Sequence, residues 1–223
     1  MERTPLKNRK MPVYTRGEEI MNMVTHIVGG GVGVIIFILC TVVSALSKNP
    51  WSIVSSVIYG FSMVALYTVS SVYHGLKLNT GKRVMQIIDH CTIYMLIAGT
   101  YTPILLVGIR PHNPVVAWVV FGVQWGLASL AATLTAIDLK KYKVFSMICY
   151  IIMGWMIIFT IKPAIQALTY NGFIWVLAGG ISYTIGAVLY GIGRKVRYFH
   201  SVFHIFVNIG SLLQAIGIIF YVL

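Results

Sequence analysis

The chain has 223 residues, of which 58% are hydrophobic and only 10% are charged. Together with a mean hydropathy of +0.84, this excludes a soluble globular domain and predicts an integral membrane protein. A net charge of +12 would suit a nucleic-acid partner, but the basic residues lie in short clusters between apolar stretches. Membrane orientation accounts for such clusters, so we expect no nucleic-acid partner.

Seven apolar stretches follow one another along the chain, each long enough for one crossing of the hydrocarbon core. They cover residues 21–46, 51–76, 84–107, 114–137, 144–161, 173–192 and 199–222. The connections between them are short, which leaves no room for a separate soluble domain. The sequence therefore predicts an all-α, polytopic membrane protein with a tail over residues 1–20 and a single seven-helix transmembrane domain over residues 21–223.

The basic residues are distributed unequally between the two predicted sides of the membrane. Fourteen of the seventeen Lys and Arg residues lie in the N-terminal tail and in the second, fourth and sixth connections. The opposite side has Lys48, Arg110 and Lys162. This asymmetry predicts a cytoplasmic N-terminus, an extracellular C-terminus and a multi-pass location in the cell membrane.

Three histidines are predicted at the cytoplasmic ends of two spans. His200 and His204 open the last span, and their spacing of four places both imidazoles on one helix face, about 6 Å apart along the axis. His74 ends the second span on the same side of the membrane. Three neutral imidazoles with an open fourth position are a common catalytic zinc set, so these residues are candidate ligands of Zn²⁺. Interfacial histidines bonded to headgroups or backbone remain the alternative.

Two further polar side chains are expected at the same depth. Ser70 precedes His74 by one turn on the same helix face, and Asp89 lies near the start of the third span. Because ionisable residues inside spans are costly, they mark a functional site by default. Asp89 could act as a general base or orient a ligand, and Ser70 could hydrogen-bond a water or a substrate carbonyl. A hydrogen bond to its own backbone is the alternative for Ser70.

The entry to the first span carries a polar stripe, in which Glu18, Asn22 and His26 are spaced by four. This stripe could reach the metal site. We interpret Glu18 and Glu19 as acidic residues that favour a helix N-terminus, and leave the role of His26 open. His90 directly follows the aspartate and points about 100° away from it, so we expect it to face another helix or the interface.

Taken together, these motifs resemble the hemolysin III branch of the progestin and adiponectin Q receptor family. The resemblance rests on SxxxH at the end of the second span, an aspartate followed by a GTYTP segment in the third, HxxxH opening the seventh and EExxNxxTH opening the first. It implies a seven-helix fold with the N-terminus inside and a zinc ion near the cytoplasmic face. It assigns zinc ligation to His74, His200 and His204, and a water-binding or catalytic role to Asp89 and Ser70. Relatives in the wider superfamily are regarded as membrane amide hydrolases of the ceramidase type, and bacterial members have been connected with membrane lipid homeostasis.

Three functions are compatible with these features. The first is a zinc-dependent hydrolase of a lipid amide or ester, in which Asp89 takes the proton of the attacking water. The second is a pore-forming hemolysin, although its water path would need polar groups through the full membrane thickness. The third is a membrane sensor or regulator with a structural zinc, for which Asp89 could be the fourth ligand. We expect the first, an enzyme of the bacterial plasma membrane with one zinc ion and with membrane lipids as substrate or ligand.

Overall fold

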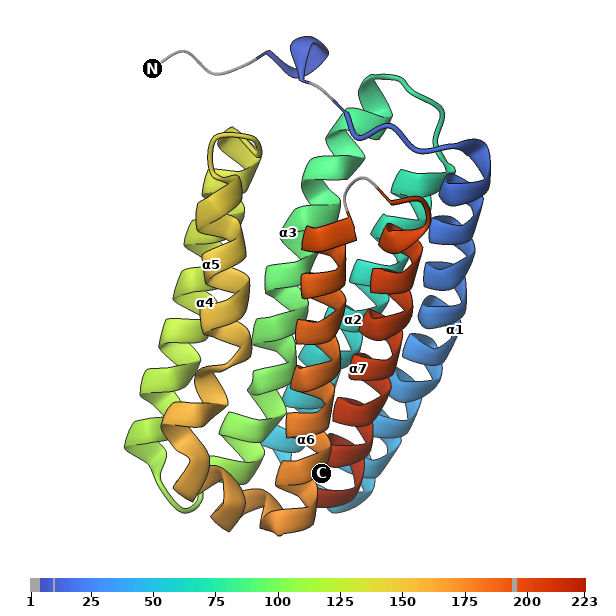
Figure 1. Ribbon diagram of the computed structural model, residues 1–223. Coiled ribbons are helices and arrows are strands. Elements are labelled where there is room, and N and C mark those ends of the chain that lie inside the picture. Colours follow the sequence, from blue (N-terminus) through green and yellow to red (C-terminus); the bar gives the residue numbers. More distant parts are fainter. Residues whose placement is uncertain (1–4, 10, 194–195) are drawn as a thin grey trace.

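A computed structural model of the protein describes residues 5–9, 11–193 and 196–223. Over these residues the chain forms seven α-helices and no β-strand, which confirms the all-α class (Figure 1). Six stretches of the described chain are long and apolar enough to cross a membrane. One of them, Lys143–Ile192, has 50 residues and contains two helices. The count of seven spans and the orientation of the termini stay predictions.

The helices agree closely with several of the predicted spans. They are α1 (Arg16–Ser47), α2 (Pro50–Gly75), α3 (Thr80–Pro103), α4 (Pro114–Ile137), α5 (Lys143–Gly154), α6 (Ile161–Ile192) and α7 (Phe199–Tyr221). The α1 helix begins before residue 21 because Thr15 and Glu18 form a capping box. The Thr15 hydroxyl accepts from the Glu18 backbone N–H, and the Glu18 carboxylate accepts from the Thr15 backbone N–H.

Two helices depart from regular geometry. Regular α-helical hydrogen bonding in α3 ends at Pro103, which lacks an N–H group, and the chain continues as a π-helix over Ile104–Ile109. The α6 helix begins at Ile161, well before the predicted start of the sixth span at residue 173, and Thr169 interrupts it with a φ of 62°. The predicted connection over residues 162–172 is therefore largely helical.

Helix α1 packs against both α2 and α7, and α7 packs against α6. The α6–α7 contact is close, since a Cβ at Gly179 would lie 2.8 Å from the backbone oxygen of Gly210. In the core, the Ser211 hydroxyl on α7 lies 2.7 Å from both the Tyr67 hydroxyl of α2 and the Tyr183 hydroxyl of α6. These contacts hold α2, α6 and α7 in fixed relative positions.

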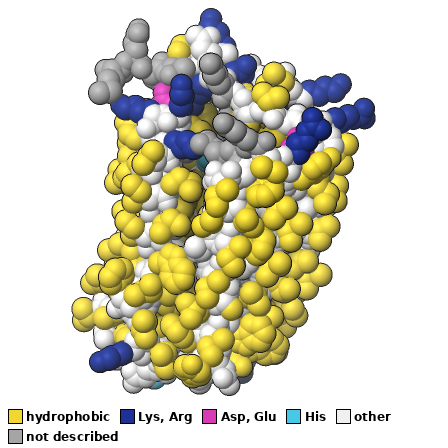
Figure 2. Space-filling view, in the orientation of Figure 1, with side chains coloured by type: hydrophobic (Ala, Val, Ile, Leu, Met, Phe, Trp, Pro, Cys, Tyr) yellow, Lys and Arg dark blue, Asp and Glu magenta, His cyan; other side chains and the backbone are white. Residues whose placement is uncertain are grey.

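The molecular surface has one basic end and long apolar sides. Figure 2 shows Lys and Arg side chains gathered at the end of the bundle where α1 begins, above sides covered by hydrophobic side chains. Large apolar residues are exposed along these sides, as lipid-facing helices require. We call this end of the bundle the basic end. Four of the residues counted for membrane orientation, Arg3, Lys10, Arg194 and Lys195, lie outside the described residues.

Candidate metal centre

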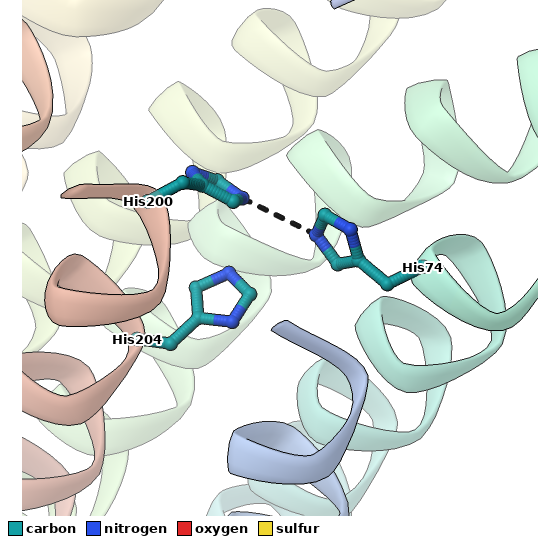
Figure 3. A group of neighbouring side chains, drawn as sticks. All are labelled: His74, His200 and His204. Carbon is teal, nitrogen blue, oxygen red and sulfur yellow. Dashed lines mark hydrogen bonds between the residues drawn. The ribbon is translucent and has the colours of Figure 1, made fainter. Parts of the chain in front are cut away.

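Three histidines from two helices converge near the basic end of the bundle (Figure 3). His74 lies in the last turn of α2, and His200 and His204 lie in the first two turns of α7. One ring nitrogen of each lies within 4.8 Å of those of the other two. The fold thus brings together the three histidines that the sequence identified, although the two helices are 126 positions apart at His74 and His200.

Hydrogen bonds to α1 determine which ring nitrogen of two histidines is free. His74 Nδ1 lies 2.7 Å from Glu19 Oε2, and His204 Nδ1 lies 3.2 Å from the backbone oxygen of Asn22. An ionised carboxylate and a backbone carbonyl can only accept, and the Asn22 side-chain amide nitrogen is much farther from His74 Nδ1, at 3.5 Å, so in both rings Nδ1 donates. Each Nε2 therefore keeps its lone pair, which is the form in which a neutral imidazole binds a metal ion.

One pair of ring nitrogens has the spacing that a zinc ion requires, and all three lie within 4.8 Å of one another. His200 Nε2 and His74 Nε2 are 3.2 Å apart. Two imidazoles on one tetrahedral zinc, each with a bond of about 2.0–2.1 Å, hold their nitrogens about 3.3 Å apart. A hydrogen bond from His200 to His74 would also satisfy this contact, and imidazoles suit copper, nickel and iron as well. The three histidines are thus a chemically suitable set of ligands for zinc, and they suit these other metals as well.

Asp89 and Ser70 lie beside the three histidines rather than among them. Both residues line a cavity of about 790 Å³ inside the bundle, as do His200 and His204. Ser70 lies next to the Asp89 carboxylate, whose side chain is 15% exposed. Among the described residues, the group close enough to share one ion contains three histidines and no carboxylate. The roles assigned to Asp89 and Ser70 stay predictions.

Glu19 is the site residue whose part the sequence analysis missed. Its carboxylate contacts His74, whereas Glu18 has the predicted N-terminal role and also accepts from the Tyr198 backbone N–H at 3.0 Å. The interpretation of Glu19 as only a helix N-terminal acid was therefore incomplete. A signal was present, because Glu19, Asn22 and Thr25 recur at every third position and so share one face of α1.

The two remaining histidines of this region do not belong to the group of three. His26 stacks on His204 with ring centroids 3.6 Å apart and an interplanar angle of 12°. Neither ring nitrogen of His26 has a hydrogen-bond partner among the described residues. His90 Nδ1 lies 2.8 Å from the Gln86 backbone oxygen on its own helix and 3.8 Å from Asp89 Oδ2, and His90 lines the same cavity as Asp89 rather than pointing away from it.

The segment before α1 covers the site on the side of the basic end. The Tyr14 ring stacks on the His200 ring at a centroid distance of 5.2 Å and an interplanar angle of 20°. Burial raises the pKa of the Tyr14 hydroxyl above its ordinary value, so this side chain is neutral at physiological pH. Tyr14 can therefore screen the imidazoles from water without adding a charge beside them.

The fold and the histidine cluster define a multi-pass protein of the cell membrane with a candidate metal centre near the basic end. Residues 14–215 match the family described as "Haemolysin-III related", and the chain belongs to this family. It is 36% identical over 206 residues to "Hemolysin-3" of Bacillus cereus, with 92% of each chain covered. It is 34% identical over 209 residues to "Hemolysin-3 homolog" of Bacillus subtilis (strain 168), covering 94% of this chain and 96% of the relative.

A more distant similarity reaches beyond bacteria. The chain is 27% identical over 170 residues to human "Monocyte to macrophage differentiation factor", covering 73% of this chain and 68% of the relative. The resemblance to hemolysin III that the sequence motifs indicated is thereby confirmed.

Proposed function

We propose that this protein is a zinc-dependent membrane hydrolase that cleaves an amide or ester bond of a lipid and acts in membrane lipid homeostasis. One observation carries the proposal: His200 and His204, two of the three histidines that can share an ion, line a cavity that Asp89 and Ser70 also line. Structural zinc sites usually have four protein ligands, whereas catalytic sites have three and keep one position open. A set of three histidines therefore favours catalysis over a purely structural ion.

Zinc, when bound, would polarise the carbonyl of the substrate and lower the pKa of a water molecule. The protein's own residues would handle the proton. The Asp89 carboxylate lies beside the histidine group and can take the proton of the attacking water, then return it to the leaving amine or alcohol. A hydrogen bond donated by the neighbouring Ser70 hydroxyl would hold this carboxylate in one orientation.

The cavity suits a lipid substrate. Its volume of about 790 Å³ falls within the range of small-molecule binding sites. Apolar side chains such as Leu96, Phe203 and Val207 line it together with the polar residues of the site. An acyl chain could lie along the apolar wall while its carbonyl group lies near the histidines. Membrane lipids are therefore the proposed substrate class.

The test is a hydrolysis screen with purified protein in nanodiscs, over a panel that includes amide-linked and ester-linked lipids. Asp89→Asn should retain zinc while turnover falls by about 10²- to 10⁴-fold, the usual contribution of a general base. Asp138→Asn is a matched control, because Asp138 lies outside the cavity and accepts from the backbone N–H groups of Lys140 and Lys141. Its turnover should equal that of the wild type.

Three other outcomes of these experiments would contradict the proposal, each in a different way. Undiminished turnover of Asp89→Asn would exclude its role as the base. Bound zinc with no hydrolysis across the panel would favour a regulator with a structural ion. Vesicle leakage that does not depend on zinc would favour a pore.

A further inference from the structure

The carboxylate of Glu19 lies between one of the three histidines and a buried lysine. Glu19 Oε2 is 2.7 Å from His74 Nδ1, and Glu19 Oε1 accepts from Lys82 Nζ at 2.6 Å. Lys82 is only 5% exposed and also donates to the Leu76 backbone oxygen at 3.0 Å. Both carboxylate oxygens are thus engaged, and the lysine itself is held from a second side.

This arrangement restrains the His74 ring. Because the carboxylate oxygen can only accept, the proton of the neutral imidazole stays on Nδ1, and Nε2 faces the other histidines. Lys82 holds the other oxygen, so the carboxylate cannot turn away without breaking an ion pair between largely buried groups. Carboxylate partners of metal-binding histidines fix the ring orientation and raise its basicity.

The same face of α1 restrains a second histidine. His204 Nδ1 lies 3.2 Å from both the Asn22 backbone oxygen and the Thr25 hydroxyl. The Ser201 hydroxyl donates to Asn22 Oδ1 at 2.6 Å and so joins this face of α1 to α7. Helix α1 contributes no histidine to the group of three, yet it sets the tautomer of two of them.

We propose that Glu19, held in place by Lys82, is a positioning residue of the metal centre that fixes His74 in its Nδ1-protonated form and thereby sets the affinity for zinc. The inference rests on the zinc site of the proposed function. It concerns a residue outside the group of three histidines and outside the proposed catalytic pair.

The first test compares zinc affinities of the full-length protein in detergent, measured by competition with a chelator of known affinity. Glu19→Gln keeps the size of the side chain and removes its charge, and we expect its zinc Kd to rise about 10- to 100-fold. Glu18→Gln makes the same chemical change one residue away, where the carboxylate contacts Thr15 and Tyr198 and no histidine. Its zinc Kd should match that of the wild type.

Two further measurements test the proposal even if Glu19→Gln does not fold. Lys82→Met leaves the carboxylate in place but frees one oxygen, and we expect a smaller rise in the zinc Kd. In the wild type, ¹⁵N NMR of labelled histidine should show His74 protonated on Nδ1, with its signals assigned from their loss in His74→Ala. A purely structural role of Glu19 would not dictate this tautomer.

The outcomes separate this inference from the proposed function. Equal zinc affinities of Glu19→Gln and Glu18→Gln, or a His74 protonated on Nε2, would overturn the positioning role and leave the hydrolase proposal intact. Affinity that depends on Glu19 without any lipid hydrolysis would overturn the proposed function alone. A wild-type protein that binds no zinc would overturn both.

Discussion

A buried hydrogen bond between Asn22 and Ser201 joins α1 to α7 beside the candidate metal centre, and we expect its removal to be costly. The Ser201 hydroxyl donates to Asn22 Oδ1 at 2.6 Å, and the two residues are 2% and 0% exposed. Hydrogen bonds between membrane helices contribute about 0.6 kcal/mol on average and about 1.7 kcal/mol at most. Short length and nearly complete burial place this bond in the upper half of that range, at about 1–1.7 kcal/mol.

A double-mutant cycle measures this quantity directly. The free energy of unfolding of wild type, Asn22→Ala, Ser201→Ala and the double variant would be obtained by SDS titration in bicelles. The loss in the double variant should be smaller than the sum of the two single losses by the coupling energy. Ser71→Ala is a control, because the Ser71 hydroxyl donates to the Tyr67 backbone oxygen within α2. Its removal breaks a hydrogen bond within one helix and none between helices. Strictly additive losses for Asn22 and Ser201 would refute the reasoning.

Two other substitutions have expected outcomes that follow from local geometry. His26→Phe should retain zinc because His26 only stacks on His204, whereas His204→Ala should lose it, and elemental analysis measures both. Loss of zinc in both variants would make His26 a ligand of the metal. Gly179→Ala should lower the free energy of unfolding by about 1–3 kcal/mol, since the new methyl group would meet the Gly210 backbone oxygen. Gly180→Ala points into open space and should leave the melting temperature unchanged or slightly higher, so equal melting temperatures for the two variants would contradict this account.

The fold could be predicted where the chain carries clear boundary signals. The predicted bounds of the fourth apolar stretch coincide with those of α4, which Asn113 caps, which has Pro114 in its first turn and which Asp138 follows. The start of α6 lies outside the predicted sixth stretch, since Lys162, Pro163 and the neighbouring polar residues interrupt the apolar pattern there. The helix forms there nonetheless, with Thr169 as its break, since packing in the bundle outweighs local composition.

The candidate site was predictable in part for a similar reason. Helical spacing and the side of the membrane place His74, His200 and His204 at one depth, and this is enough to suggest that they meet. Glu18 and Glu19 are adjacent and point about 100° apart around the helix. Neither feature says which of the two directions faces the histidines. Which of them faces His74 depends on the rotation of α1 about its own axis. Contacts with α2 and α7 determine that rotation, and they involve residues far away in the sequence.

The candidate metal centre is formed by distant parts of the chain, and this has a consequence for biosynthesis. The hydrogen-bond partners of the histidines lie at the start of α1, whereas two of the three histidines lie on α7, with 182 positions between Asn22 and His204. A nascent chain that has been translated only through α6 contains one of the three imidazoles. An ion that needs all three can bind only after the last helix has been inserted and has packed against the first. Metal content would then distinguish fully assembled molecules from chains that stall during membrane insertion.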